Sequence, residues 1–210
     1  MKHSLKYLAF LTSLLFSCEK NNDNIVISNE FVAGEYDPST IVYYDFNPDW
    51  VLAYNEIGCH QYLGLDSINI DRHSDWDLKL RYYLYNDIMG ECCTDTIGDC
   101  FGWLYLEKTI QIPDNYQIHT DSLNWVKPLN NGEVIDSKLN WCDDRTLLLF
   151  SQSGVTEPGQ GYWNWTNMVE AKYIGIRKFE SHDTIYGWIL VDAKSNISIK
   201  EYAFNQKIYK

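Results

Sequence analysis

The stretch that decides the fold is Lys172–Gln206, which reads KYIGIRKFESHDTIYGWILVDAKSNISIKEYAFNQ. It holds three apolar runs, Tyr173–Arg177, Thr184–Val191 and Ile197–Tyr202, separated by polar residues that favour turns. The middle run is apolar on both alternating faces, with Ile185, Ile189 and Val191 on one and Tyr186, Trp188 and Leu190 on the other. Eight residues are short for a helix, and this pattern is typical of a strand buried on both sides of a sheet. We therefore expect this run to form the centre of the core.

The rest of the chain reads as short strands with turns between them, and almost no stretch predicts a helix. Further strands are expected at Ile25–Ile27, Ile41–Phe46, Gln61–Asp66, Trp76–Tyr85, Phe101–Ile112, Val134–Asp136 and Thr146–Phe150. Turns are expected at Asp37-Pro38 and Asn47-Pro48. About ten short strands with this turn chemistry predict an all-β fold, with a single jelly-roll-like β-sandwich domain over residues 25–210.

The strand expected at Trp76–Tyr85 alternates most regularly and so predicts one wall of the sandwich. Its core-facing residues are expected to be Trp76, Leu78, Leu80, Tyr82 and Leu84. Its water-facing residues are expected to be Asp77, Lys79, Arg81, Tyr83 and Tyr85.

The N-terminus reads as an export signal. Lys2 and Lys6 precede the apolar segment Leu8–Phe16, which is too short to span a bilayer as a helix. The segment ends in Leu15-Phe16-Ser17-Cys18, which resembles the lipobox of bacterial lipoproteins. The resemblance implies a signal peptide over residues 1–17, lipidation of Cys18, and a lipid-anchored tether over residues 18–24. The protein would then belong to the bacterial cell envelope, anchored in the outer membrane on its periplasmic or surface face. The alternative is an ordinary secretory signal that leaves Cys18 free.

Charge and cysteine content narrow the partners and the compartment. The net charge of −12 disfavours nucleic acid as a partner. An exported chain meets oxidising conditions, so Cys59, Cys92, Cys93, Cys100 and Cys142 are disulfide candidates. Pairing of Cys92 or Cys93 with Cys100 would close a small loop, and Cys59 with Cys142 is the next expected pair. Zinc is the alternative, but the spacing fits no common zinc knuckle.

The polar segment around Asp71 resembles an Asp-rich calcium loop. The ligand candidates are Asn69, Asp71, Asp75 and Asp77. Ser74 stands where such loops carry glycine, and Leu80 stands where they carry the bidentate acid. We expect either a degenerate calcium site or a hairpin turn without an ion, and no other cofactor.

A second candidate site is the glycine-flanked aromatic loop GQGYWNW at residues 159–165. Tyr162, Trp163 and Trp165 could stack on sugar rings, which makes a glycan the leading ligand class. The alternative is that these rings cap the core of the sandwich.

The triplet Asp-Ser/Thr-aliphatic occurs four times. It resembles the acceptor triplet of O-glycosylation in certain lipoprotein-rich Gram-negative bacteria, which would make four side chains glycan sites where exposed. They are Ser67, Thr96, Ser122 and Thr184. The alternative is ordinary turn chemistry at strand starts.

Several motifs near the C-terminus are similar to a secreted β-rich module of bacterial lipoproteins, of unknown function. They are VKPLNNGEVIDS (Val126–Ser137), Leu139-Asn140-Trp141, Trp163, YIGIR, YGWI and EYAF. The resemblance implies an all-β extracellular fold and no activity. Within these motifs, Gly175 and Gly187 indicate a close approach of an aromatic ring or a bulge. Arg177 is expected to pair with an acid or to stack on a ring such as Trp188.

No catalytic motif is recognisable, so we expect no enzyme. The sequence favours a membrane-anchored extracytoplasmic lipoprotein whose β-sandwich binds a ligand, with a glycan first among the ligands. The alternative is a structural or accessory subunit of an envelope assembly, with an envelope protein as the partner. A carbohydrate-active hydrolase with a carboxylate pair comes third.

Overall fold

The computed structural model of the protein describes residues 31–36, 41–70, 77–87, 103–154, 170–180, 183–194 and 196–205. Within these ranges every regular element is a strand. The strands are β1 (Phe31–Val32), β2 (Ile41–Val51), β3 (Asn55–Gly58), β4 (Gln61–Ile68), β5 (Leu78–Asp87), β6 (Trp103–Gln111), β7 (Tyr116–His119), β8 (Pro128–Leu129), β9 (Val134–Ile135), β10 (Trp141–Cys142), β11 (Thr146–Gly154), β12 (Lys172–Glu180), β13 (Asp183–Asp192) and β14 (Ser198–Asn205). None of the described residues lies in a helix that could cross a membrane.

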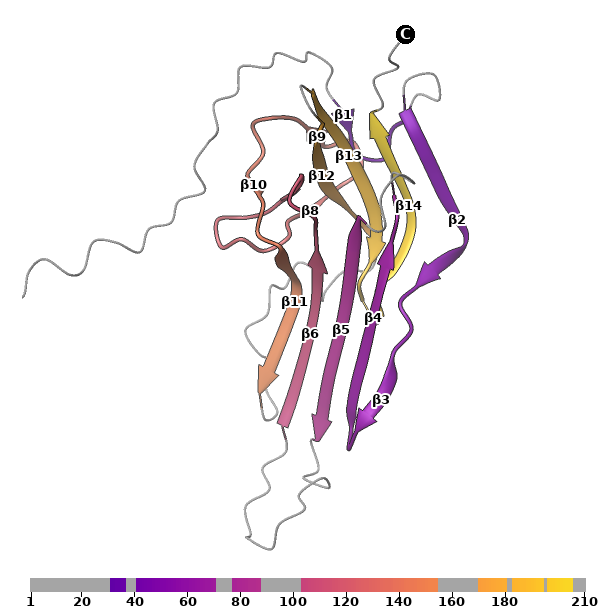
Figure 1. Ribbon diagram of the computed structural model, residues 1–210, viewed down its shortest axis with the longest axis vertical. Coiled ribbons are helices and arrows are strands. Elements are labelled where there is room, and N and C mark those ends of the chain that lie inside the picture. Colours follow the sequence, from indigo (N-terminus) through magenta and orange to yellow (C-terminus); the bar gives the residue numbers. More distant parts are fainter. Residues whose placement is uncertain are drawn as a thin grey trace, which may run out of the picture.

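The strands form two large antiparallel sheets and a short two-stranded one. The seven-stranded sheet has the order β10-β7-β12-β13-β14-β2, with β8 added beside β12. The five-stranded sheet has the order β11-β6-β5-β4-β3, and β1 pairs with β9. Consecutive strands pair from β3 to β6, as Figure 1 shows, and again from β12 to β14, whereas the other pairs join strands that are far apart in the sequence. The predicted all-β sandwich is confirmed.

Two separate apolar clusters cover the two faces of the seven-stranded sheet at its centre, while its edge strand β2 stays largely exposed. The larger cluster fills the space between the two large sheets and includes Leu80, Ile110, Ile176 and Ile189. The smaller cluster lies on the other face, where Trp188 packs with residues of β1 and β9. Central strand β13 contributes to both clusters, so its expected burial on two sides is confirmed.

Gly187 in β13 shows why this sheet needs a glycine at its centre. A methyl group there would stand 2.5 Å from Cδ1 of Phe204 and 2.7 Å from the carbonyl oxygen of Ala203. The ring of Phe204 thus lies against the bare backbone, as the sequence predicted. At Gly175 the nearest atoms are Cδ1 of Leu129 at 3.1 Å and Cβ of His119 at 3.3 Å, so aliphatic groups approach the backbone there and the expected aromatic ring does not.

The differences from the expected strands lie at short or irregular elements. Strand β2 continues through the cis Asn47-Pro48 bond, where a turn was expected, and its pairing with β14 is shifted between Ile199 and Glu201. Two-residue strands such as β8 and β10 carry too few side chains for an alternation to show. The strand expected at Ile25–Ile27 lies outside the described residues.

Candidate functional site

The outer face of the five-stranded sheet carries the candidate site. The pairing of the strands determines which side chains are neighbours on this face. Tyr83 of β5 lies opposite both Leu63 of β4 and Glu107 of β6. Tyr85 lies opposite Tyr105 in the same way. The alternate residues of β5 point inward to the main cluster, so these side chains point away from the seven-stranded sheet.

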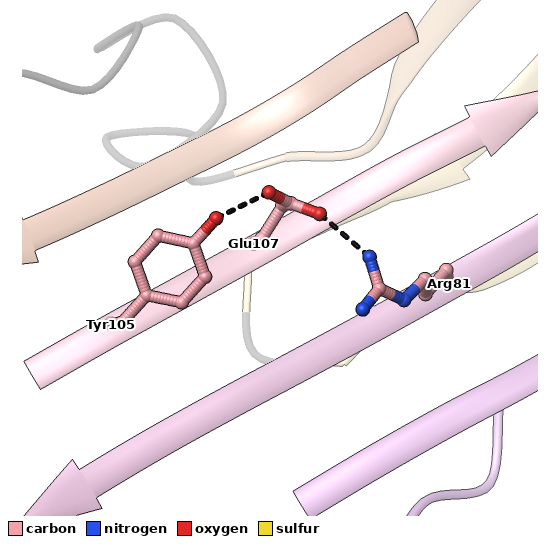
Figure 2. A network of polar contacts seen from close by, with 3 residues as sticks. All are labelled: Arg81, Tyr105 and Glu107. Atoms are coloured by element: carbon pink, nitrogen blue, oxygen red, sulfur yellow. Dashed lines mark hydrogen bonds and ion pairs between the residues drawn. The ribbon is translucent and has the colours of Figure 1, made fainter. Parts of the chain in front are cut away.

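Three side chains on this face form a linked polar network, drawn in Figure 2. The guanidinium Nη1 of Arg81 donates to Oε1 of Glu107 at 2.9 Å, and the hydroxyl of Tyr105 donates to Oε2 of the same carboxylate. The Arg81 side chain is 40% exposed and that of Glu107 is 20% exposed. The hydrogen bond to Glu107 and, to a smaller extent, burial raise the pKa of Tyr105, so its hydroxyl stays protonated.

Aromatic rings flank the network. The guanidinium carbon of Arg81 lies 5.6 Å from the ring centroid of Tyr83, and the rings of Tyr83 and Tyr105 lie 5.8 Å apart. A sugar offers apolar C–H faces and hydroxyl groups. Partly exposed aromatic rings can stack on the C–H faces, and a paired carboxylate and guanidinium can form hydrogen bonds with the hydroxyl groups. The face can therefore bind a neutral polyhydroxylated ligand.

The sequence predicted part of this face. Alternation in β5 placed Arg81, Tyr83 and Tyr85 on the water-facing side, and the structure confirms that placement. Tyr105 and Glu107 lay inside an expected strand but were not singled out. The pairing of β5 with β6 brings them together, and only a correct strand register could have revealed that.

Of the four calcium candidates, the structure describes Asn69 and Asp77, while Asp71 and Asp75 lie outside the described residues. Asp77 is fully buried, although the sequence placed it on the water-facing side. Its carboxylate accepts hydrogen bonds from the Ile70 backbone N–H at 2.5 Å and from the Tyr116 hydroxyl at 3.0 Å. Both oxygens are thus engaged by protein donors.

A different acidic group could hold a cation. Cys142, Asp143 and Asp144 place one ligand atom each within 4.8 Å of one another. The two carboxylates are exposed neighbours in the chain, and such groups are common without an ion. We assign no metal to them.

Two of the predicted disulfide candidates are described. Cys142 in β10 is buried and keeps its thiol, so the expected pairing of Cys59 with Cys142 is wrong. Cys59 lies exposed in the turn between β3 and β4, and the topology separates the two, because β3 and β10 belong to different sheets. Cys92, Cys93 and Cys100 lie outside the described residues.

The remaining predicted sites are only partly described. Ser67 and Ser122 are exposed and Thr184 is partly buried, which leaves the two serines accessible to modification. The other predicted site residues, which lie outside the described ranges, are Cys18, Thr96, Tyr162, Trp163 and Trp165.

No protein-family model matches the sequence, and no curated protein or solved structure shows significant similarity to it. The class of protein that fold and site define is therefore an all-β sandwich with an aromatic and charged outer face. The resemblance to the exported β-rich module stays a prediction.

Proposed function

We propose that the protein is a lipid-anchored protein of the bacterial cell envelope whose β-sandwich binds a glycan on the outer face of the five-stranded sheet. The observation that supports binding at this face is the Arg81–Glu107–Tyr105 network beside the ring of Tyr83. The lipid anchor rests on the lipobox-like residues that end at Cys18.

The charges on this face favour a neutral glycan. Arg81 and Glu107 already neutralise one another, so neither needs a charged ligand. Each side chain is also partly exposed and keeps further hydrogen-bonding capacity, because a guanidinium has five donors and a carboxylate has about four acceptor positions. The hydroxyl groups of the sugar would thus bond to Arg81 and Glu107, and its C–H faces would stack on the aromatic rings.

Glycan-array binding of the detergent-solubilised protein tests the proposal, with calcium and again with EDTA. We expect binding that EDTA does not change, and Tyr83→Ala should weaken it about five- to twelvefold, since stacking on one ring contributes about 1–1.5 kcal/mol. Glu107→Gln should weaken it similarly by breaking the ion pair. Tyr44→Ala on β2, a tyrosine with 36% exposure in the other sheet, is the matched control and should bind normally.

Other outcomes point elsewhere. Binding that EDTA abolishes would move the site to the segment from Asn69 to Asp77. Binding that survives Tyr83→Ala but fails when Trp163 and Trp165 are replaced by alanine would move it to the aromatic loop. No binding in either buffer would contradict the proposal and favour a subunit of an envelope assembly.

We further propose that Cys59 is disulfide-bonded to a cysteine of the β5–β6 connection. The register Gly58↔Gln61 and Gln61↔Tyr85 places the turn with Cys59 at the end of the sheet where β5 ends. Strand β6 begins at the same end, since Asp87 lies opposite Trp103. The chain between them contains three cysteines, at positions 92, 93 and 100.

Peptide mapping without reduction tests this pairing. The Cys59 peptide should appear joined to a peptide from residues 88–102, whereas Cys142 should react with a thiol reagent only after unfolding, because it is buried. A Cys59 peptide joined to Cys142, or Cys59 alkylated in the native protein, would contradict the proposal.

A further inference from the structure

We infer that Arg177 in β12 is a binding site for the carboxylate group of a ligand, on the face of the seven-stranded sheet opposite to the main cluster. This site is independent of the proposed glycan face, which belongs to the other sheet.

The guanidinium of Arg177 is held between rings and neutral acceptors. Its Nε donates to Oε1 of Gln117 at 2.7 Å, and its Nη2 donates to the same oxygen. The guanidinium carbon lies 4.8 Å from the ring centroid of Trp141 and 5.0 Å from that of Phe179. It therefore stacks on Trp141 rather than on Trp188, which corrects the expectation from the sequence.

No carboxylate of the described residues forms an ion pair with this arginine within 4 Å. Burial lowers the pKa of Arg177, while the Tyr186 hydroxyl and the more distant Asp143 act in the opposite direction. The imidazole of His119, whose ring centroid lies 6.3 Å from that of Trp141, adds no second positive charge there, because burial lowers its pKa and favours the neutral ring. Since a partly desolvated cation without an anionic partner is costly, an added carboxylate would be bound favourably.

Arg177 keeps hydrogen-bond donors for such a ligand. A guanidinium has five N–H donors, of which Gln117 receives two. The remaining donors lie in the guanidinium plane, where a carboxylate can bind with two parallel hydrogen bonds. Arg177 is partly exposed and Phe179 beside it is 39% exposed, so the site is open to solvent.

Thermal unfolding of the detergent-solubilised full chain tests the inference at constant ionic strength. The probes are galacturonate and acetyl-glycylglycine, with galactose and acetyl-glycylglycine amide as their neutral counterparts. Both carboxylates at about ten times their dissociation constant should raise the melting temperature by about 2–5 °C, and the neutral compounds should not. A response to only one carboxylate would assign the site to that class, sugar acid or peptide terminus. Arg177→Gln should abolish the response.

Because Arg177→Gln could fail to fold, Gln117→Glu provides a second test. It places a carboxylate where the Gln117 amide oxygen now contacts Arg177. The variant should melt at a higher temperature and lose its response to both probes, while the control Gln61→Glu on β4 should keep the response. No shift in the unmodified protein, an equal shift in Arg177→Gln, or a Gln117→Glu variant that melts lower and still responds would overturn the inference.

Discussion

Replacing Asp77 with alanine should lower the free energy of unfolding by about 3–4 kcal/mol. The side chain is fully buried, and its two oxygens accept hydrogen bonds from the Ile70 N–H and the Tyr116 hydroxyl. Alanine would leave both donors buried without a partner, and each such group costs about 1–3 kcal/mol. Urea unfolding of the purified protein would measure the loss as a lower midpoint at an unchanged slope.

The size of this effect follows from what Asp77 joins. Its own N–H donates to the Ile68 carbonyl, while its carboxylate accepts from Ile70, so it fixes the end of β4 to the start of β5. The bond to Tyr116, the first residue of β7 in the seven-stranded sheet, adds a polar link between the two sheets. A buried acid with these hydrogen bonds stabilises the sandwich.

Three variants separate this explanation from a general loss of charge. Asp77→Asn keeps one acceptor and should cost only about 1–2 kcal/mol, and Tyr116→Phe should cost about as much. Asp66→Ala removes an exposed acid that bonds only its neighbouring Ser67 N–H, and it should cost less than about 0.5 kcal/mol. If Asp77→Ala cost as little stability as Asp66→Ala, the proposed role of the Asp77 hydrogen bonds in joining β4, β5 and β7 would be refuted.

Asp77 also shows where prediction from this sequence stops. Alternation correctly assigned the two faces of β13 and the outward side chains of β5, since burial follows directly from a period of two. The same rule predicted that Asp77 faces water, because the alternation of residues does not show that two hydrogen-bond donors surround this carboxylate in the interior. Hydrogen bonds between distant elements depend on register and layer contacts, and these are absent from local sequence.

The sites depend on the same long-range contacts. The network on the outer face needs β5 paired with β6 so that Arg81 reaches Glu107 across the strands. Arg177 was recognised as unusual on an apolar strand, but its stacking partner Trp141 belongs to the two-residue strand β10, which no pattern revealed. Residue type thus indicated Arg177 but not Tyr105 or Glu107, and the sheet topology decided what these side chains contact.

Lys108 should make the protein more stable as the pH rises from 7.5 to 9.5, by about 2 kcal/mol. This lysine in β6 is 1% exposed, and its amine donates to the carbonyls of Ala193 and Lys194 beyond β13. The ring of Tyr82 also lies beside it, at 5.8 Å from the amine. Burial lowers its pKa from 10.5 to about 8, although the negative charge of Asp192 opposes the change.

The direction of this change in stability follows from the number of protons that the folded and unfolded states bind. Below pH 8 both states carry the proton, and the folded state bears the cost of a buried ammonium. Between about 8 and 10.5 the unfolded chain binds more protons than the folded one, so the free energy of unfolding rises with pH. Above pH 10 the raised pKa values of Tyr43, Tyr82 and Tyr105 act in the opposite direction, because their folded forms resist ionisation. The window from 7.5 to 9.5 therefore lies below the range in which these tyrosines ionise.

Urea unfolding across this window compares the protein with Lys108→Met, which should show almost no change with pH. The exposed Lys138→Met variant is the control and should keep the full rise, since the Lys138 side chain is 89% exposed. A flat profile in the unmodified protein would mean that the two carbonyls solvate the ammonium well enough to cancel its burial cost. The same rise in Lys108→Met would assign the pH dependence to another group. Either result would show that burial of the Lys108 ammonium does not set the pH dependence of stability.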